Sequence, residues 1–319
     1  MQNLKDDKSA PVAVRPLREA DLTEARLIFH LAFGTFLGLS EPMRFCAGRD
    51  FFRGRYFANP EGFLGAEAHG MLIGSNIASH WGSVGFLGPL AIHPDFWDRG
   101  VARKLLEPTV QLFDRWHTRH AGLFTFPHST KHVHLYQKFG FAPRFLTAVM
   151  SKTVRPPASS LDGELYYSGL TPARQSECLK ASLELSDAIY EGLDLRGEIR
   201  AVAEQKLGEV IFLWNGSQLM AFAICHCGAE TEAGELTCYV KFGAARHAKG
   251  LEQLLSACEA LAVRRGLTRI EAGVSTAREE AYRRMQARGF RTDVLGVAMH
   301  RPNEAGYSRP EAFVLDDWR

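Results

Sequence analysis

The sequence predicts an α/β chain of the α+β kind, with two tandem domains that each form a mixed, mostly antiparallel sheet flanked by helices. Its 319 residues correspond to about two domains of roughly 150 residues each. Hydrophobic residues make up 46% and charged residues 23%, which excludes wholesale disorder. Alternating and helical hydrophobic patterns follow one another in a similar order in both halves. These three observations together predict the fold class.

The first predicted domain, residues 1–154, shows a regular succession of strand and helix patterns. Asp21 followed by Glu24 predicts a capping box at the start of the first helix. His69–Gly70 between two alternating runs predicts a hairpin turn. The expected strands are 12–17, 63–68, 71–80, 84–92, 123–126 and 145–152, and the expected helices are 21–33, 100–117 and 129–139.

A short segment rich in proline and serine, residues 155–160, predicts a linker between the domains. The second predicted domain is residues 161–319. Its expected strands are 164–167, 210–214, 219–225, 236–242 and 269–272, and its expected helices are 249–265 and 277–287.

The two halves share a constant sequence offset. Leu105–Leu106 corresponds to Leu254–Leu255, since 254 − 105 = 149, and Gly140–Phe141 corresponds to Gly289–Phe290, since 289 − 140 = 149. Each pair alone is common, but the equal offset indicates a duplicated domain.

Composition and charge narrow the classes of partner. The formal net charge is +2, so the chain has no global field for holding a nucleic acid. Residues 1–10 lack the apolar core of a signal peptide, and no long apolar run predicts a membrane span. Six scattered cysteines favour reduced thiols and a cytoplasmic location. We expect no nucleic acid, membrane or metal partner, and we interpret Cys225-His226-Cys227 as part of a buried strand.

The segment LAIHPDFWDRGVARKLL, residues 90–106, combines a strand, a short loop and the start of a helix. Gly100 and Ala102 are small where a ligand would approach the backbone. The unpaired N–H groups of a helix N-terminus suit an anion such as pyrophosphate. A turn of this kind is weak as a signal when it stands alone.

A second segment, STKHVHLYQKFGF at residues 129–141, predicts a short helix that Gly140 ends. Ser129, His132 and Tyr136 share one face of this helix. Taken alone, a tyrosine at the position of Tyr136 is more often a packed aromatic residue than a catalytic acid.

Together, the two segments resemble the cofactor-binding core of the GNAT-type N-acetyltransferases, over roughly residues 12–152. In that family a loop and helix hold the pyrophosphate of acetyl-CoA, and two strands separate around its pantetheine. Gly100 and Ala102 match the family's loop motif, whereas Trp97 stands at its leading Gln/Arg position and Ser129 replaces a frequent Asn. The resemblance implies one catalytic residue, Tyr136, and cofactor-binding positions Leu90, Ala91, Ile92, Asp98, Arg99, Gly100, Val101, Ala102, Arg103 and Ser129.

The resemblance implies an acetyl-CoA-dependent N-acetyltransferase that needs no metal. A primary amine on a small molecule or peptide would attack the thioester directly, and Tyr136 would protonate the departing thiolate. The sequence does not identify the general base, the acceptor or the oligomeric state. Candidate bases are His80, Glu67, His128 and His132, and Cys46 is a remote candidate acyl carrier. The alternative is a non-catalytic acyl-CoA-binding or scaffolding protein.

The second half keeps the framework without the motif residues. At the 149-residue offset, Gly100 becomes Lys249, Ala102 becomes Leu251, Ser129 becomes Arg278 and Tyr136 becomes Met285. A leucine would crowd a phosphate, and methionine has no proton to donate. We therefore expect a degenerate second domain that serves for packing or walls the acceptor cleft.

One further stretch, residues 45–57, interleaves aromatic residues with arginines. Stacking combined with positive charge suits single-stranded nucleic acid, and helices at acceptor sites also have this composition. We favour a buried amphipathic helix over both.

Overall fold

The structure is a computed structural model that describes residues 11–155 and 164–319. Apart from Arg155, the predicted linker lies outside the described residues. The first half contains β1 (Ala13–Pro16), α1 (Leu22–Phe36), α2 (Arg53–Ala58), β2 (Phe63–Ala68), β3 (Met71–Trp81), β4 (Val84–Ile92), α3 (Val101–Arg115), β5 (His120–Thr125), α4 (Thr130–Gln137) and β6 (Ala142–Thr153).

The second half contains β7 (Glu164–Tyr166), α5 (Pro172–Ile189), α6 (Arg196–Glu204), β8 (Gly208–Asn215), β9 (Gln218–Gly228), β10 (Gly234–Ala245), α7 (Ala248–Arg264), β11 (Arg269–Ser275), α8 (Glu279–Ala287), β12 (Arg291–Arg301) and β13 (Phe313–Leu315). Every predicted strand and helix is present, with ends shifted by a few residues. The sequence patterns did not predict α5, α6, β12 or β13, and α2 overlaps the stretch 45–57, where a buried amphipathic helix is expected. None of the helices in the described ranges is long and apolar enough to cross a membrane.

The predicted capping box at α1 is wrong. Asp21 does precede α1, but its carboxylate caps no N–H of that helix. It accepts a hydrogen bond from the backbone N–H of Arg18 at 2.8 Å and pairs with Arg15 at 2.7 Å. A turn of 3-10 helix over Glu19–Asp21 comes first and directs the Asp21 side chain back towards β1.

One continuous mixed sheet joins the two halves, in the order β1-β2-β3-β4-β5-β12-β6-β11-β10-β9-β8-β7, with β13 on β10. Two neighbouring pairs, β4–β5 and β10–β11, are parallel. Helices cover both faces of the first half: alternate residues of β4 face them in turn, because Ala91 packs in the cluster that contains Phe29 of α1 and Ile92 in the cluster that contains Leu105 of α3.

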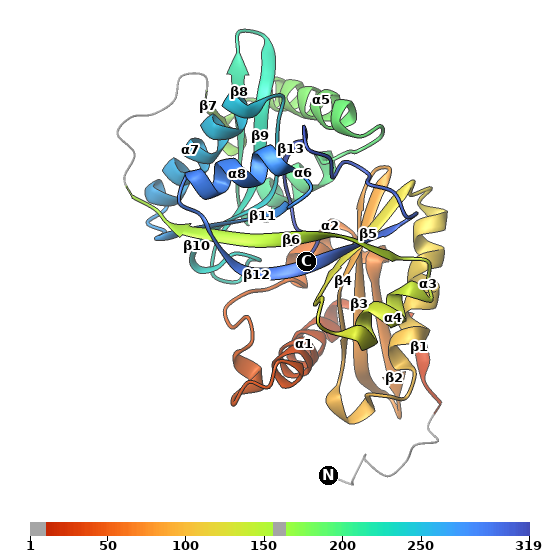
Figure 1. Cartoon of the computed structure of the whole chain (residues 1–319). Coiled ribbons are helices and arrows are strands. Elements are labelled where there is room, and N and C mark those ends of the chain that lie inside the picture. The colour runs from red at the N-terminus through yellow and green to blue at the C-terminus, as the bar shows by residue number, and fades with distance from the viewer. Residues whose placement is uncertain (1–10, 156–163) are drawn as a thin grey trace.

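Two long strands, β6 of the first half and β12 of the second, each lie beside strands of the other half. β12 pairs with β5, while β6 pairs with both β12 and β11. Figure 1 shows β6 and β12 as two long strands that cross from one half to the other. The predicted boundary near residue 154 therefore divides the chain in sequence, whereas in space the two halves exchange strands within one sheet.

The 149-residue offset recurs in the element boundaries. β5, α4 and β6 begin at residues 120, 130 and 142, and β11, α8 and β12 begin at 269, 279 and 291. Each difference is 149 residues (269 − 120, 279 − 130, 291 − 142). The exchanged strands β6 and β12 are thus equivalent elements of the two halves.

Two buried histidines lie at the exchange seam. His120 of β5 and His300 of β12 have ring nitrogens 3.1 Å apart, and both residues are fully buried. Burial lowers the pKa of His120 to about 4, helped by Arg144, and burial together with His120 lowers the pKa of His300 to about 3. Both rings are therefore neutral in the folded protein near pH 7.

We expect the seam to lose stability between pH 6.5 and pH 4. The unfolded chain binds protons on these histidines near pH 6.5 and the folded chain does not, so the free energy of unfolding falls as the pH falls through this window. The loss is on the order of 3 kcal/mol for one such histidine. Urea unfolding of wild type and His120→Gln/His300→Gln across this range measures it. Equal pH slopes in the two proteins would contradict the assignment.

Candidate active site

The parallel strands β4 and β5 separate half-way along their length. They pair from Val84 opposite His120 to Leu87 opposite Leu123, and their pairing ends there. A bulge on β4 follows, because the four residues from Leu87 to Leu90 lie opposite only the three residues from Asn76 to Ala78 of β3. Beyond this point, β4 and β5 no longer satisfy each other's backbone groups, so an extended ligand can hydrogen-bond to them.

The backbone of β4 beyond the bulge faces this separation. His93 N–H donates to the Ile73 carbonyl of β3 at 2.8 Å, so alternate residues Leu90 and Ile92 direct their polar groups away from β3. Trp97 donates its indole N–H to the Ile92 carbonyl at 2.7 Å. The predicted role of Ile92 towards a pantetheine therefore falls to its N–H. Trp97, the departure from the loop motif, fastens the loop to the end of β4.

The loop after β4 leads into the N-terminus of α3. Gly100 precedes the helix in the left-handed conformation, with φ of +73°, which favours glycine. The first helical hydrogen bond runs from Lys104 N–H to the Gly100 carbonyl. The N–H groups of Val101, Ala102 and Arg103 thus form the orphan first turn that can receive an anion.

The side chains of the predicted loop have local partners. Asp98 pairs with Lys131 of α4, Arg99 lies over the Phe96 ring at 4.9 Å, and Arg103 pairs with Glu107 at 3.0 Å. Backbone groups, rather than these side chains, are therefore the candidates for contacting a pyrophosphate.

The helix α4 places Ser129 and Tyr136 close to the end of β5. Ser129 precedes α4 and is buried, and its side chain caps no helical N–H. Tyr136 is 8% exposed and packs in an apolar cluster with Leu106, Leu123 and Phe141. Burial raises the pKa of its phenol, so Tyr136 is protonated at neutral pH, the state that a proton donor requires.

Comparison with known proteins identifies this arrangement. Residues 30–141 match the family model of the acetyltransferase (GNAT) family. They form a GNAT acetyltransferase domain. No curated protein matched the sequence.

Solved structures with the GNAT fold match more than nine-tenths of the chain. A putative acetyltransferase from Pyrococcus horikoshii has a TM-score of 0.69 and 13% identity, covering 95% of this chain and 93% of that one. A GCN5-related N-acetyltransferase from Sphaerobacter thermophilus has a TM-score of 0.59 and 18% identity, covering 92% and 96%. A tandem GNAT protein from the clavulanic acid biosynthesis pathway has a TM-score of 0.55 and 12% identity, covering 91% and 98%. At these identities the likeness shows the fold.

Of the four candidate bases, two lie by the carboxyl end of β5 in the GNAT domain. The rings of His128 and His132 lie 6.1 Å and 4.8 Å from the ring of Phe36 on α1. His80 instead pairs with Gly85 near the start of β4 and stacks on Trp116.

Glu67, the fourth candidate base, and Cys46, the candidate acyl carrier, have surroundings that disfavour these roles. Glu67 accepts a hydrogen bond from Arg15 at 2.6 Å, so its carboxylate is already held in an ion pair. Burial raises the pKa of Cys46, which disfavours the thiolate that an acyl carrier needs.

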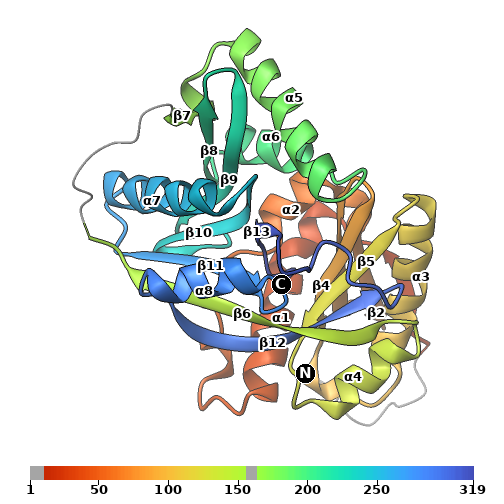
Figure 2. The same cartoon turned by 45° about the horizontal axis from the view of Figure 1, so that its top comes forward.

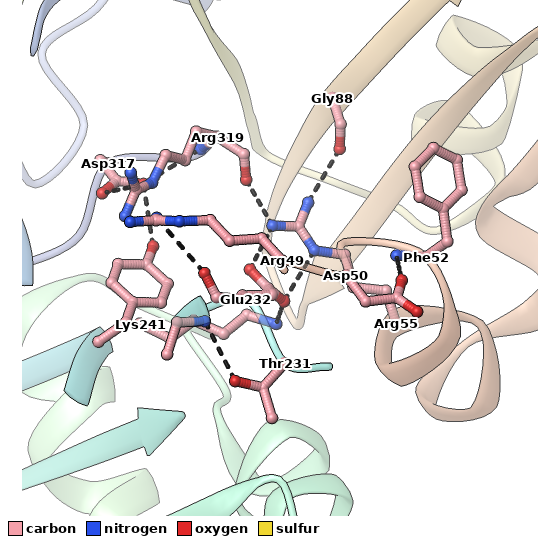
Figure 3. Close-up of polar contacts among 12 residues, drawn as sticks. Arg49, Asp50, Phe52, Arg55, Gly88, Thr231, Glu232, Lys241, Asp317 and Arg319 are labelled. Carbon is pink, nitrogen blue, oxygen red and sulfur yellow. Dashed lines mark hydrogen bonds and ion pairs between the residues drawn. The ribbon is translucent and has the colours of Figure 1, made fainter. Parts of the chain in front are cut away.

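Two arginines of residues 45–57, Arg49 and Arg55, take part in buried ion pairs between the halves, which the sequence did not predict (Figure 3). Arg55 of α2 donates two hydrogen bonds to Glu232, at 2.9 and 2.5 Å. Glu232 also pairs with Lys241 at 2.7 Å. The remaining nitrogen of Arg55 donates to the Gly88 carbonyl at 2.9 Å, at the point where β4 leaves β5. The second half therefore supports the separation of the two strands.

Arg49 makes a second ion pair across the same junction. Its guanidinium donates to both oxygens of Glu271, at 2.8 and 2.9 Å. Arg319 also pairs with Glu271, and it pairs with Asp317 as well. Because Arg49 and Arg55 are neutralised here, neither side chain contributes to a nucleic-acid surface. The expected amphipathic helix is present only in part, because α2 covers residues 53–57 of the stretch.

In the second half, the corresponding separation of strands is filled by the chain itself. β10 and β11 pair from Thr237 opposite Arg269 to Val240 opposite Ala272. Beyond that point β13 pairs with β10, with Val314 opposite Ala244.

Contacts of Arg278 and Asp317 hold β13 and the residues after it in place. Arg278, the counterpart of Ser129, is fully buried and donates to the Val314 carbonyl at 3.0 Å and to Asp316 at 2.8 Å. Asp317 lies so close to Gly273 of β11 that a Cβ there would be 2.3 Å from it. Residues 313–317 thus fill the gap of the second half that corresponds to the separation of β4 from β5 in the first half.

The triplet Cys225-His226-Cys227 lies in β9. Sγ of Cys225 lies 3.8 Å from that of Cys258, and Sγ of Cys227 lies 3.9 Å from that of Cys238. His226 is fully buried on the other face of the strand, against Tyr239. Within the described residues, no group of three or more potential ligands could hold a metal ion.

Proposed function

We propose that the GNAT domain transfers the acetyl group of acetyl-CoA to a primary amine of a small molecule or peptide. The observation that carries this proposal is the separation of β4 from β5 directly before the orphan N–H groups of α3. The open strand edge suits the amides of pantetheine, and the helix N-terminus suits pyrophosphate.

In the proposed reaction, the neutral amine attacks the thioester carbonyl directly. The new C–N bond forms as the C–S bond breaks, and the departing sulfur takes a proton from Tyr136. The amine loses its extra proton to a base or to water, and His128 and His132 are the candidates on this side of the sheet. No covalent acyl-enzyme is required.

The alternative proposal is a non-catalytic acyl-CoA-binding or scaffolding protein. The burial of Tyr136 among apolar side chains favours it, because a packed tyrosine needs no chemical role. The cytoplasmic location also remains a proposal, which the six unpaired cysteines support.

We expect acetyl-CoA to raise the melting temperature of the wild-type protein and not that of Gly100→Asp. At about 100 times its dissociation constant, a ligand stabilises the folded state by about 2.7 kcal/mol, or several degrees. Aspartate at position 100 would place a negative charge at the pyrophosphate site. Thermal unfolding with and without acetyl-CoA measures the difference.

The matched control is Gly100→Asn, which has the same backbone strain and nearly the same shape without the charge. It should keep more of the thermal shift than Gly100→Asp. A full shift in Gly100→Asp would contradict the placement of pyrophosphate at α3. No shift in the wild type would contradict acetyl-CoA binding itself.

A further inference from the structure

A cavity of about 720 Å³ lies where β6, β11 and β12 meet, at the side of the second half. Its lining comes from the end of β6, the starts of β11 and β12, helix α7 and the two residues that follow α8. Figure 2 shows α7 and α8 alongside these strands. The separation of β4 and β5 lies elsewhere in the sheet, beyond β12. The volume is in the range of small-molecule sites, about 300–1,000 Å³.

Five cationic side chains line this cavity, against one carboxylate: Lys152, Arg155, Arg269, Arg288 and Arg291, with Glu259. Glu259 is already neutralised, because Lys152 lies 3.1 Å and Arg288 2.9 Å from the same oxygen. It therefore fixes two of the cations in place instead of opposing an anion.

The remaining arginines leave positive charge uncompensated at the mouth. Arg269 pairs with Asp293 at 2.7 Å. Arg155 and Arg291 are exposed, and within the described ranges neither has an ion-pair partner. A chain with a formal net charge of only +2 thus concentrates cations from three strands, from the residue after α8 and from the second residue after β6 around one cavity.

We propose that this cavity is a binding site for a compact phosphate-bearing small molecule, such as a polyphosphate or a phosphate ester. Guanidinium groups match phosphate oxygens in geometry and charge. Among the described lining residues none is aromatic, which disfavours the base stacking that single-stranded nucleic acid uses. The proposal does not depend on the acetyltransferase function.

Such a ligand would also stabilise the strand exchange. Ser151, Lys152 and Thr153 belong to the first half of the chain, whereas Arg269 and Arg291 belong to the second. A phosphate that contacts both groups links them across the seam between β6 and its two neighbours. Binding should therefore raise the melting temperature as well as release heat.

The test is a calorimetric titration of the full chain with inorganic triphosphate at constant ionic strength. We expect one site in the wild type, and at least about tenfold weaker binding in Arg155→Gln/Arg291→Gln, since charged hydrogen bonds are lost. Both residues are exposed and outside the ion pairs of the described chain, so the variant should fold. Its melting temperature without ligand provides the check.

The matched control is Lys180→Gln/Arg53→Gln, which removes two exposed cations from α5 and α2, two helices that contribute no lining residue to the cavity. Unchanged affinity in this control supports a specific site. Equal weakening in both variants would overturn the proposal in favour of diffuse charge, and undiminished binding in Arg155→Gln/Arg291→Gln would place the anion elsewhere. A single-stranded oligonucleotide that binds where triphosphate does not would also overturn it.

Discussion

Replacement of Arg55 by methionine should lower the free energy of unfolding by about 3–5 kcal/mol, the usual cost of breaking a buried ion pair. The side chains of Arg55 and Glu232 are 3% and 2% exposed. Burial alone would raise the pKa of Glu232, but Arg55 and Lys241 outweigh it and hold that pKa well below its usual range. Without Arg55, a buried carboxylate loses its main partner, and the Gly88 carbonyl loses its donor. Urea unfolding measures the loss.

Arg53→Met is the matched control for this prediction. Arg53 lies on the same short helix but is exposed and lies over the Phe57 ring at 5.1 Å. Its removal should cost less than about 1 kcal/mol. The double variant Arg55→Met/Glu232→Leu should recover part of the loss, since it removes the unpaired carboxylate. If Arg55→Met is no less stable than Arg53→Met, the ion pair does not hold the halves together.

Tyr136→Phe should lower the rate of acetyl transfer by about 10²-fold or more, the usual contribution of a general acid. Phenylalanine keeps the ring in its apolar cluster and removes only the proton donor. The affinity for acetyl-CoA should therefore stay within a few-fold of the wild-type value. Release of CoA thiol in the presence of a panel of small and peptide amines measures the rate, and thermal shift measures binding.

Tyr56→Phe provides the comparison for the loss of a phenol elsewhere in the first half, where the ring packs against Phe63. Its transfer rate should equal that of the wild type. A Tyr136→Phe protein that binds acetyl-CoA and transfers the acetyl group at the wild-type rate would contradict the role of Tyr136 as general acid. A wild type that binds acetyl-CoA without transfer to any amine would favour the non-catalytic alternative.

Local patterns were sufficient for most of the fold. The alternation in residues 63–80 and the turn at His69–Gly70 predict β2 and β3 within a residue, because neighbouring residues determine a hairpin. The sequence also contains a start signal for α5 that the predicted elements above do not include: Thr171 caps its N-terminus and Pro172 occupies the first turn. The loop and helix that carry Gly100 were likewise predicted from nearby residues alone.

Long-range partners could not be predicted in the same way. The hydrophobic pattern of β6 requires a neighbouring strand but does not say whether β5 or β11 provides it. Arg55 and Glu232 are separated by 177 residues, and the local sequence around either residue does not predict a contact with the other. The role of Trp97 was missed for a related reason, since a motif position reports only the residue type and not a hydrogen bond to Ile92.

The exchange of β6 and β12 also constrains the order in which the strands can pair during translation. When the first half has left the ribosome, β5 has no antiparallel neighbour, because residues 291–301 do not yet exist. The nascent GNAT domain must then keep an open sheet edge, the kind that invites pairing with other chains. Until β12 is available, the edge of β5 either stays unpaired or pairs with β6 of the same half, and β12 then displaces β6. The two halves of this chain can therefore reach their final pairing only together, after translation of the second.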